Sequence, residues 1–111
     1  MTRKKSLLPK PVFGLIEYLL GEYDHMLGLL QSEDPLIPST TLLGAVRRVL
    51  AISRALDRLQ PHHRRLFELC YRRKLPRSRV CLEMGISEEA FLRYRRELVL
   101  AVGQELGFIL A

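Results

Sequence analysis

Arginines gather in segment 77–96, RSRVCLEMGISEEAFLRYRR, and their spacing suits contact with a polyanion. A guanidinium can place two parallel donors on a phosphate or on guanine O6 and N7. Arg93 and Arg96 are three residues apart, so on a helix they share one face. We therefore expect these two arginines to read base edges in a duplex groove, with Leu92 beside them to touch a thymine methyl.

The elements that must position these arginines are two short helices joined at a glycine. Counting Arg77 as position one, the small Cys81 is fifth, Gly85 ninth and the large apolar Phe91 fifteenth. This layout is typical of DNA-binding helix-turn-helix units. Gly85 can adopt a positive φ at the corner, and Ser87 can cap the second helix. The alternative interpretation is an ordinary helical hairpin packed in a core.

The remaining candidates divide by the part of DNA that they suit. Ser87, Glu88 and Glu89 open the second helix on its outward edge, where a carboxylate can accept from cytosine N4 but repels phosphates. Other polar side chains are better suited to phosphates, which fix the register without reading sequence. These are Arg77, Ser78, Arg79, Arg95, Arg72, Arg73 and Lys74.

The length of the chain and the distribution of its charges limit the size of the domain and the kind of partner. The chain has 111 residues, 48% of them hydrophobic, and a formal net charge of +6, which suits a small domain with a polyanionic partner. Residues 12–46 hold five acids and no Lys or Arg, a net charge of −5. Residues 47–96 hold fourteen Lys or Arg and five acids, a net charge of +9. The arginine segment lies inside this basic part, which favours double-stranded DNA as the partner.

Hydrophobic periodicity predicts an all-α fold without strands. Residues 1–11 are expected to be a basic flexible tail, residues 12–60 a helical arm, and residues 61–111 the helix-turn-helix domain. The arm holds two amphipathic helices, an acidic one over 12–31 and another over 42–60. The second should bury a stripe consisting of Leu42, Val46, Val49, Leu50, Ser53 and Leu56. Further helices are expected over 62–73 and 88–106, the last one capped by Gly107.

Other chemistry has little support, so we expect no catalytic site, no metal and no cofactor. His62 and His63 are adjacent in the first turn of a helix, and their rings should diverge too far to share a metal ion. The sequence holds no phosphate-binding glycine loop and no nucleophile elbow. Cys70 and Cys81 are expected to be small core residues rather than a disulfide.

No apolar run approaches the roughly 20 residues that span a bilayer, so we expect no membrane partner and a cytoplasmic protein.

Residues 56–108 resemble RinA-type phage transcriptional activators, and they are also similar to ArpU-type regulators and to sigma-factor region 4. The resemblance rests on the patch CYRR at 70–73, the skeleton Val80, Met84 and Ile86, the Tyr94-Arg95 centre and the closing ELGF at 105–108. It implies a sequence-specific activator of phage late genes that acts with host RNA polymerase. Such proteins often open the recognition helix with polar or basic residues, where this chain has Glu88 and Glu89.

The acidic helix over 12–31 cannot favour DNA, so it predicts a protein contact. The candidates are a homodimer through 12–31 or the C-terminal tail, RNA polymerase, or packing on the domain itself. Gly14, Gly21 and Gly28 lie seven apart and form one row, which either admits a close helix or is merely tolerated. Two further functions stay open: a small DNA-packaging (terminase) subunit, and a helical protein-interaction module that binds no DNA.

Overall fold

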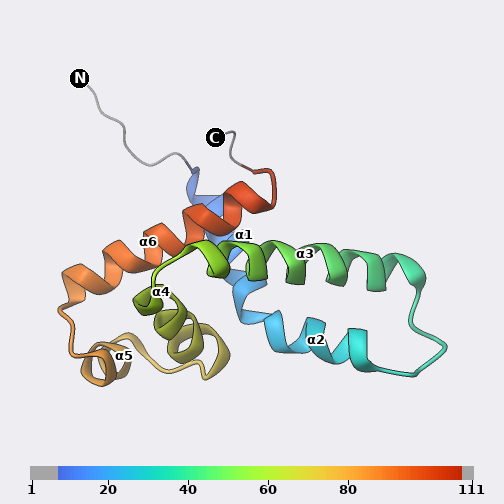
Figure 1. The fold of residues 1–111 in the computed structure, drawn as a ribbon, viewed down its shortest axis with the longest axis horizontal. Helices are drawn as coiled ribbons and strands as arrows, with labels where there is room; N and C mark the ends of the chain where they lie inside the picture. Colours follow the sequence, from blue (N-terminus) through green and yellow to red (C-terminus); the bar gives the residue numbers. More distant parts are fainter. Residues whose placement is uncertain (1–7, 109–111) are drawn as a thin grey trace.

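The computed structural model describes residues 8–108, and every regular element within them is a helix. This confirms the all-α fold for these residues. Of the basic tail expected over 1–11, residues 1–7 lie outside the described part, as do residues 109–111, whereas Leu8 is buried and Lys10 and Pro11 already belong to the first helix. Figure 1 shows the arrangement. The elements are α1 (Lys10–Gly21), α2 (Tyr23–Gln31), α3 (Ser39–Arg58), α4 (Pro61–Leu66), the π-helix η1 (Phe67–Arg72), α5 (Arg77–Met84) and α6 (Glu88–Glu105).

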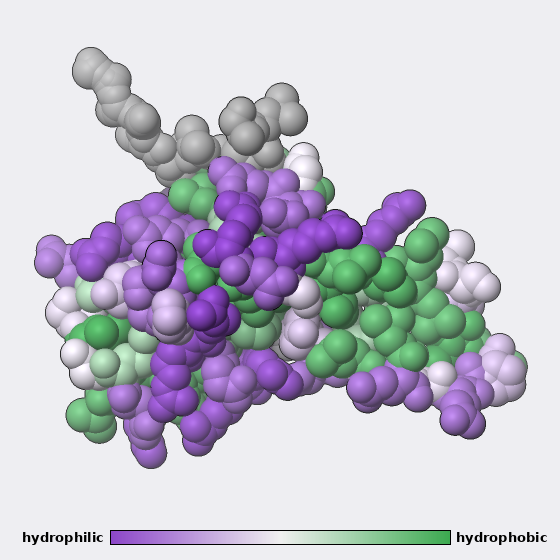
Figure 2. All heavy atoms as spheres, viewed as in Figure 1, coloured by the Kyte–Doolittle hydropathy of each residue, from purple (hydrophilic) through white to green (hydrophobic). Residues whose placement is uncertain are grey.

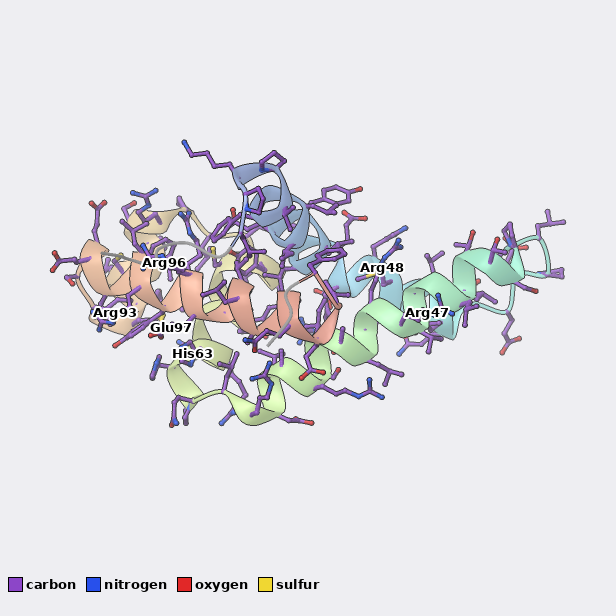
Figure 3. All side chains as sticks on the ribbon, turned by 90° about the horizontal axis from the view of Figure 1, so that it is seen from above. Arg47, Arg48, His63, Arg93, Arg96 and Glu97 are labelled. Atoms are coloured by element: carbon purple, nitrogen blue, oxygen red, sulfur yellow. The ribbon has the colours of Figure 1, made fainter. Side chains whose placement is uncertain are left out.

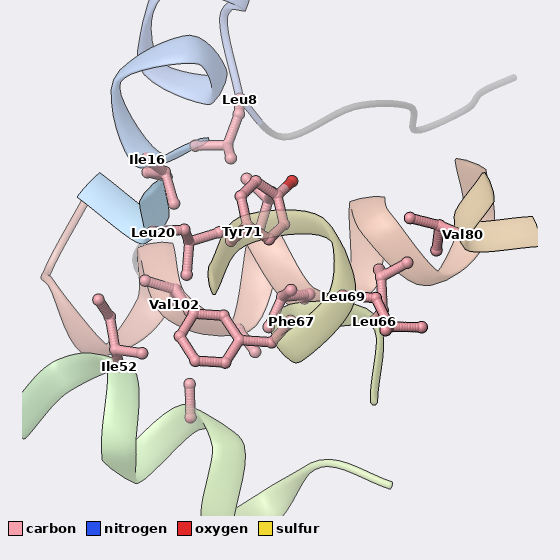
Figure 4. Close-up of a cluster of buried hydrophobic side chains, with 14 of the residues drawn as sticks. Leu8, Ile16, Leu20, Ile52, Leu66, Phe67, Leu69, Tyr71, Val80 and Val102 are labelled. Carbon is pink, nitrogen blue, oxygen red and sulfur yellow. The ribbon is translucent and has the colours of Figure 1, made fainter. Parts of the chain in front are cut away.

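One hydrophobic core joins the first and last helices. Ile16 and Leu20 of α1 are fully buried and belong to the same cluster as Ile52 of α3, Leu66 of α4 and Val102 of α6 (Figure 4). Helix α1 packs on η1 and α6. The core therefore crosses the boundary that the sequence placed after residue 60, and α1 is an integral part of the structure that carries α6.

The acidic segment 12–31 forms two helices rather than the single one expected. The chain bends at Glu22, whose φ and ψ are −94° and 4°. The ammonium of Lys74 donates to the carbonyl of Gly21 at 2.7 Å, so that carbonyl is held from outside the helix. Only α2 and the first half of α3 then project from the core as a two-helix hairpin (Figure 1).

Helix α3 buries a different face from the stripe predicted. Its buried residues are Ala45, Ala51, Ile52 and Ala55. The expected core residues Val46 and Leu50 are 37% and 43% exposed, and Leu42, Val49, Ser53 and Leu56 are half-buried. Because α3 packs on both α2 and α6, its alanines allow close approach, and the larger side chains are left outside.

The expected helix over 62–73 also divides. Gln60 and His63 form a reciprocal cap at the start of α4, and the π-helix η1 follows. The wider turn of η1 places Phe67, Leu69 and Tyr71 in the core, including Leu69, which the helical pattern did not predict. Lys74 ends this part with a left-handed φ of 56°, and Pro76 precedes α5.

Candidate nucleic-acid interface

The corner between α5 and α6 has the local structure that the sequence predicts. Gly85 has a φ of 66°, and the N–H of Ile86 donates to the carbonyl of Cys81 at 3.0 Å. The Ser87 hydroxyl accepts from the N–H of Ala90 at 3.0 Å and so caps α6. In Figure 1, α5 is seen nearly end-on while α6 runs across the view, so the two helices cross steeply. Buried Val80 and Phe91 hold them together.

Arg93 and Arg96 lie on the first half of α6 and are both exposed (Figure 3). The guanidinium of Arg93 lies 5.1 Å from the centre of the Tyr94 ring. Arg96 has no ion pair or hydrogen bond to any residue between 8 and 108. Neither arginine is used to hold the fold together, so both are available to an external anion.

The other candidate residues at the start of α6 differ in exposure and in their contacts. Glu88 and Glu89 are exposed in its first turn, where acids interact favourably with the helix dipole. The Ser87 hydroxyl is already committed to the cap. Leu92 is half-buried and packs against the core. The outward edge therefore consists mainly of two carboxylates followed by two guanidinium groups.

Some of the residues expected to contact phosphate are free to do so. Arg73, Arg77 and Ser78 are exposed. The Arg77 guanidinium lies 5.6 Å from the centre of the Phe91 ring, beside the start of α6. Arg79 is also exposed, but its Nε is 3.1 Å from a carboxylate oxygen of Glu83 in the next turn of α5.

Two of the expected phosphate contacts instead join elements of the fold. Arg72 donates to Asp24 of α2 at 2.8 Å and also pairs with Glu68. The hydrogen bond to Asp24 raises the pKa of Arg72. Lys74 donates to the carbonyls of Gly21 and Tyr71, 2.7 and 3.2 Å away, at the ends of α1 and η1. These side chains would have to leave their partners to reach DNA.

Arg95 points toward α1 rather than along the outward edge. Its guanidinium lies over the rings of Phe13 and Phe91, and its Nε is 3.8 Å from the Glu17 carboxylate. That Nε is buried and has no hydrogen-bond partner among the described residues. The geometry assigns Arg95 a position between α1 and α6, where its contacts are with the protein.

Glu17 completes a link that the sequence did not reveal. The Tyr71 hydroxyl donates to its carboxylate at 2.5 Å. Burial, and then this hydrogen bond, raise the pKa of Tyr71 far above its ordinary value. Glu17 thus joins α1 to η1 through Tyr71 and to α6 through Arg95. The only signal in the sequence was a carboxylate interrupting an apolar run.

The two adjacent histidines do not diverge as expected. The ring centroids of His62 and His63 are 4.1 Å apart, and candidate ligand atoms of both histidines and Glu97 lie within 4.8 Å of one another. The rings converge because His62 stacks on Tyr94 while His63 turns inward.

Hydrogen bonds nevertheless occupy both ring nitrogens of His63. Nδ1 accepts from the backbone N–H of Gln60 at 3.2 Å, and Nε2 lies 2.8 Å from Glu97. With Nδ1 accepting, Nε2 of the neutral ring carries the proton. Metal binding at Nε2 would displace that proton to Nδ1 and break the cap of α4. The cluster is therefore better suited to capping than to metal binding.

Two exposed groups of side chains were not among the predicted DNA-contact residues. Leu82 on α5 is 77% exposed and is the largest apolar side chain presented by that helix. Arg47 and Arg48 on α3 are exposed, and Figure 3 shows them well away from Arg93 and Arg96. Arg47 and Arg48 therefore lie apart from the arginines at the α5–α6 corner.

Within residues 8–108, no helix combines the length and hydrophobicity needed to cross a membrane. Comparison of the chain with models of protein families, with curated proteins and with solved structures gave no match. The resemblance to RinA-type activators stays a prediction.

Proposed function

We propose that this chain is a sequence-specific DNA-binding regulator of transcription that places α6 in the major groove. The observation that carries the proposal is the exposure of Arg93 and Arg96 on one edge of α6, beside a steeply crossed α5. The major groove of B-DNA is about 12 Å wide and admits an α-helix. Arginine is also the side chain best suited to bidentate contact with guanine.

The surroundings of α6 support the same docking mode. Arg73, Arg77 and Ser78 are exposed, and contacts of these residue types to phosphates fix the position of a helix in the groove. Glu88 and Glu89 would repel phosphates, which favours a position for the start of α6 deep in the groove, over base edges. A cytosine N4 amino group is the donor that such carboxylates accept from.

The biological setting rests on the resemblance to RinA-type activators. It supports a regulator of phage late genes that acts in the cytoplasm with host RNA polymerase. The α2–α3 hairpin projects from the side of the molecule away from the α5–α6 corner (Figure 1), so a protein partner could reach it while α6 lies on DNA.

Fluorescence anisotropy with a duplex selected for binding tests the proposal. Arg93→Ala and Arg96→Ala should each weaken binding by roughly 1–3 kcal/mol, the size of one lost bidentate base contact. Arg48→Ala removes the same charge from an exposed site on α3, and is expected to change binding far less. Equal losses in all three variants would show that only net charge matters.

Salt dependence separates the alternatives. A DNA binder loses affinity steeply as salt rises, because counterions released from DNA contribute much of the binding free energy. Negligible affinity for any duplex would instead favour a protein-interaction module. A large ring in a mass measurement would favour the DNA-packaging subunit.

A further inference from the structure

The α2–α3 hairpin has an apolar outer face that no other part of residues 8–108 covers. Leu43, Val46 and Leu50 of α3 are 51%, 37% and 43% exposed. Their spacing of three and four residues places them in one row, which we call the α3 stripe. The opposite face of α3 is already buried through Ala45, Ile52 and Ala55. The helix is therefore apolar on two faces.

The shape of the hairpin leaves this face without a partner inside the described chain. Helix α2 packs on α3 and touches α1, so it covers only the face of α3 opposite the α3 stripe. Figure 2 shows a continuous hydrophobic area over α3 and the adjoining part of the hairpin, bordered by hydrophilic residues. Leu36, in the loop that joins the two helices, is 85% exposed. A contiguous apolar patch with a polar border is typical of a protein–protein contact.

The charges around the stripe indicate what covers it. At the tip of the hairpin, Glu33 and Asp34 are exposed, and residues 12–46 contain no Lys or Arg. Toward the core, exposed Arg54 follows the stripe on the same side of α3, and exposed Arg47 lies at the edge of the stripe, between Val46 and Leu50 in the sequence. Neither arginine has an ion pair with a residue from 8 to 108. The face is thus acidic at the tip and basic at Arg54, with the apolar stripe between them and Arg47 at its edge.

The charges of this face are complementary to those of a second copy whose α3 runs in the opposite direction. If two α3 helices cross antiparallel at Val46, Arg54 of one copy lies about 12 Å from the crossing point, at a helical rise of about 1.5 Å per residue. The start of α3 in the other copy, Ser39, lies about 10 Å from the crossing point on the same side, next to the loop that carries Glu33 and Asp34. A parallel pair would bring like charges together at both ends.

We propose that the α3 stripe binds a second copy of this chain, α3 against α3 and antiparallel, with Asp34 of each copy near Arg54 of the other. The contact is symmetric, because the same patch serves both copies. This surface differs from residues 12–31, part of which is already used: Ile16 and Leu20 are buried in the core. Under the DNA-binding function proposed above, the dimer would present two α6 helices related by a twofold axis, which favours a palindromic site.

Sedimentation equilibrium of the full chain tests the surface. The wild-type protein should have twice the 12.9 kDa mass of one chain. Leu50→Glu places a carboxylate in both halves of the contact. We expect it to raise the dimer dissociation constant by roughly a hundredfold, about tenfold for each copy.

Leu82→Glu is the matched control, because it makes the same change at an exposed leucine of α5 and should leave the dimer intact. Circular dichroism checks that each variant keeps its helices, and Leu43→Glu replaces Leu50→Glu if that variant does not fold. A wild-type protein that stays at 12.9 kDa, or a dimer that Leu82→Glu weakens as much as the stripe variants do, would overturn the proposal.

Charge exchange tests the direction of the two helices. Asp34→Arg alone and Arg54→Asp alone should each weaken the dimer, and the two together should restore it. A double variant weaker than both single variants would rule out the antiparallel arrangement. None of these measurements involves DNA, so failure of this proposal and failure of the DNA-binding function are distinguishable.

Discussion

Leu20→Ala tests whether α1 and α6 share one hydrophobic core. Leu20 has no exposed surface and lies in the cluster that also contains Phe67, Leu69 and Val102. Replacing a fully buried leucine by alanine costs about 2–5 kcal/mol, the lost transfer free energy plus the cavity. A domain of this size has a free energy of unfolding of about 5–15 kcal/mol. The substitution should therefore remove a large fraction of the stability.

Urea denaturation followed by far-UV circular dichroism measures this loss. A single transition shifted to lower urea is expected, because the whole described chain shares one core. Leu36→Ala is the control: that side chain is 85% exposed, and its loss should change stability by about 0.5 kcal/mol or less. A loss below about 1 kcal/mol for Leu20→Ala, or two separate transitions, would refute the shared core.

Three further perturbations have defined outcomes. Tyr71 has a raised pKa, so the folded chain keeps a phenol proton that the unfolded chain loses near pH 10. The contribution of Tyr71 to the free energy of unfolding is therefore complete below about pH 10, and above it this contribution falls by up to about 1.4 kcal/mol per pH unit. Urea titrations across this range should show a shallower alkaline decline for Tyr71→Phe, and an identical decline would contradict the raised pKa of the buried Tyr71 hydroxyl. Gly85→Ala has open space for its Cβ but a φ of 66°, so backbone strain alone should cost about 1–2 kcal/mol in the same denaturation assay; no loss would show that the corner relaxes. Zn²⁺ should leave the Tm unchanged, because Nδ1 of His63 caps α4, and a clear rise in Tm would show that the ring turns to bind metal.

The local features of the fold could be predicted from the sequence because they depend on neighbouring residues. Gly85 and Gly107 have the expected positive φ, and Ser87 makes the expected cap. Val80 and Phe91 are buried as their spacing predicted. Each of these depends on backbone preference or on periodicity within one or two turns.

The structure departs from the sequence-based expectations where distant residues decide the outcome. The bend after Gly21 involves Lys74, 53 residues away. Arg72 and Arg95 were expected at the DNA, but they meet Asp24 and Glu17 of the first two helices. Helical periodicity alone cannot distinguish an arginine that faces solvent from one that faces another helix.

Helix α3 shows the same limit for apolar residues. One face of the helix carries larger side chains and another carries alanines, and the hydrophobic periodicity predicted that the larger side chains form the core. In the structure the face bearing Ala45, Ala51 and Ala55 is buried, and Val46 and Leu50 remain outside. The hydrophobic pattern therefore indicated only the face with the larger side chains, and the packing of α2 and α6 decided that the alanine face was covered.

The most direct test of α6 as the reading element is selection of bound duplexes from a random pool, at one stated salt concentration, for the wild-type chain and for Arg93→Ala. We predict that the wild type enriches a short defined site and that Arg93→Ala enriches the same site with preference lost at one base pair. No enriched site for the wild type, or an unchanged preference for Arg93→Ala, would contradict a role for this helix edge in reading DNA.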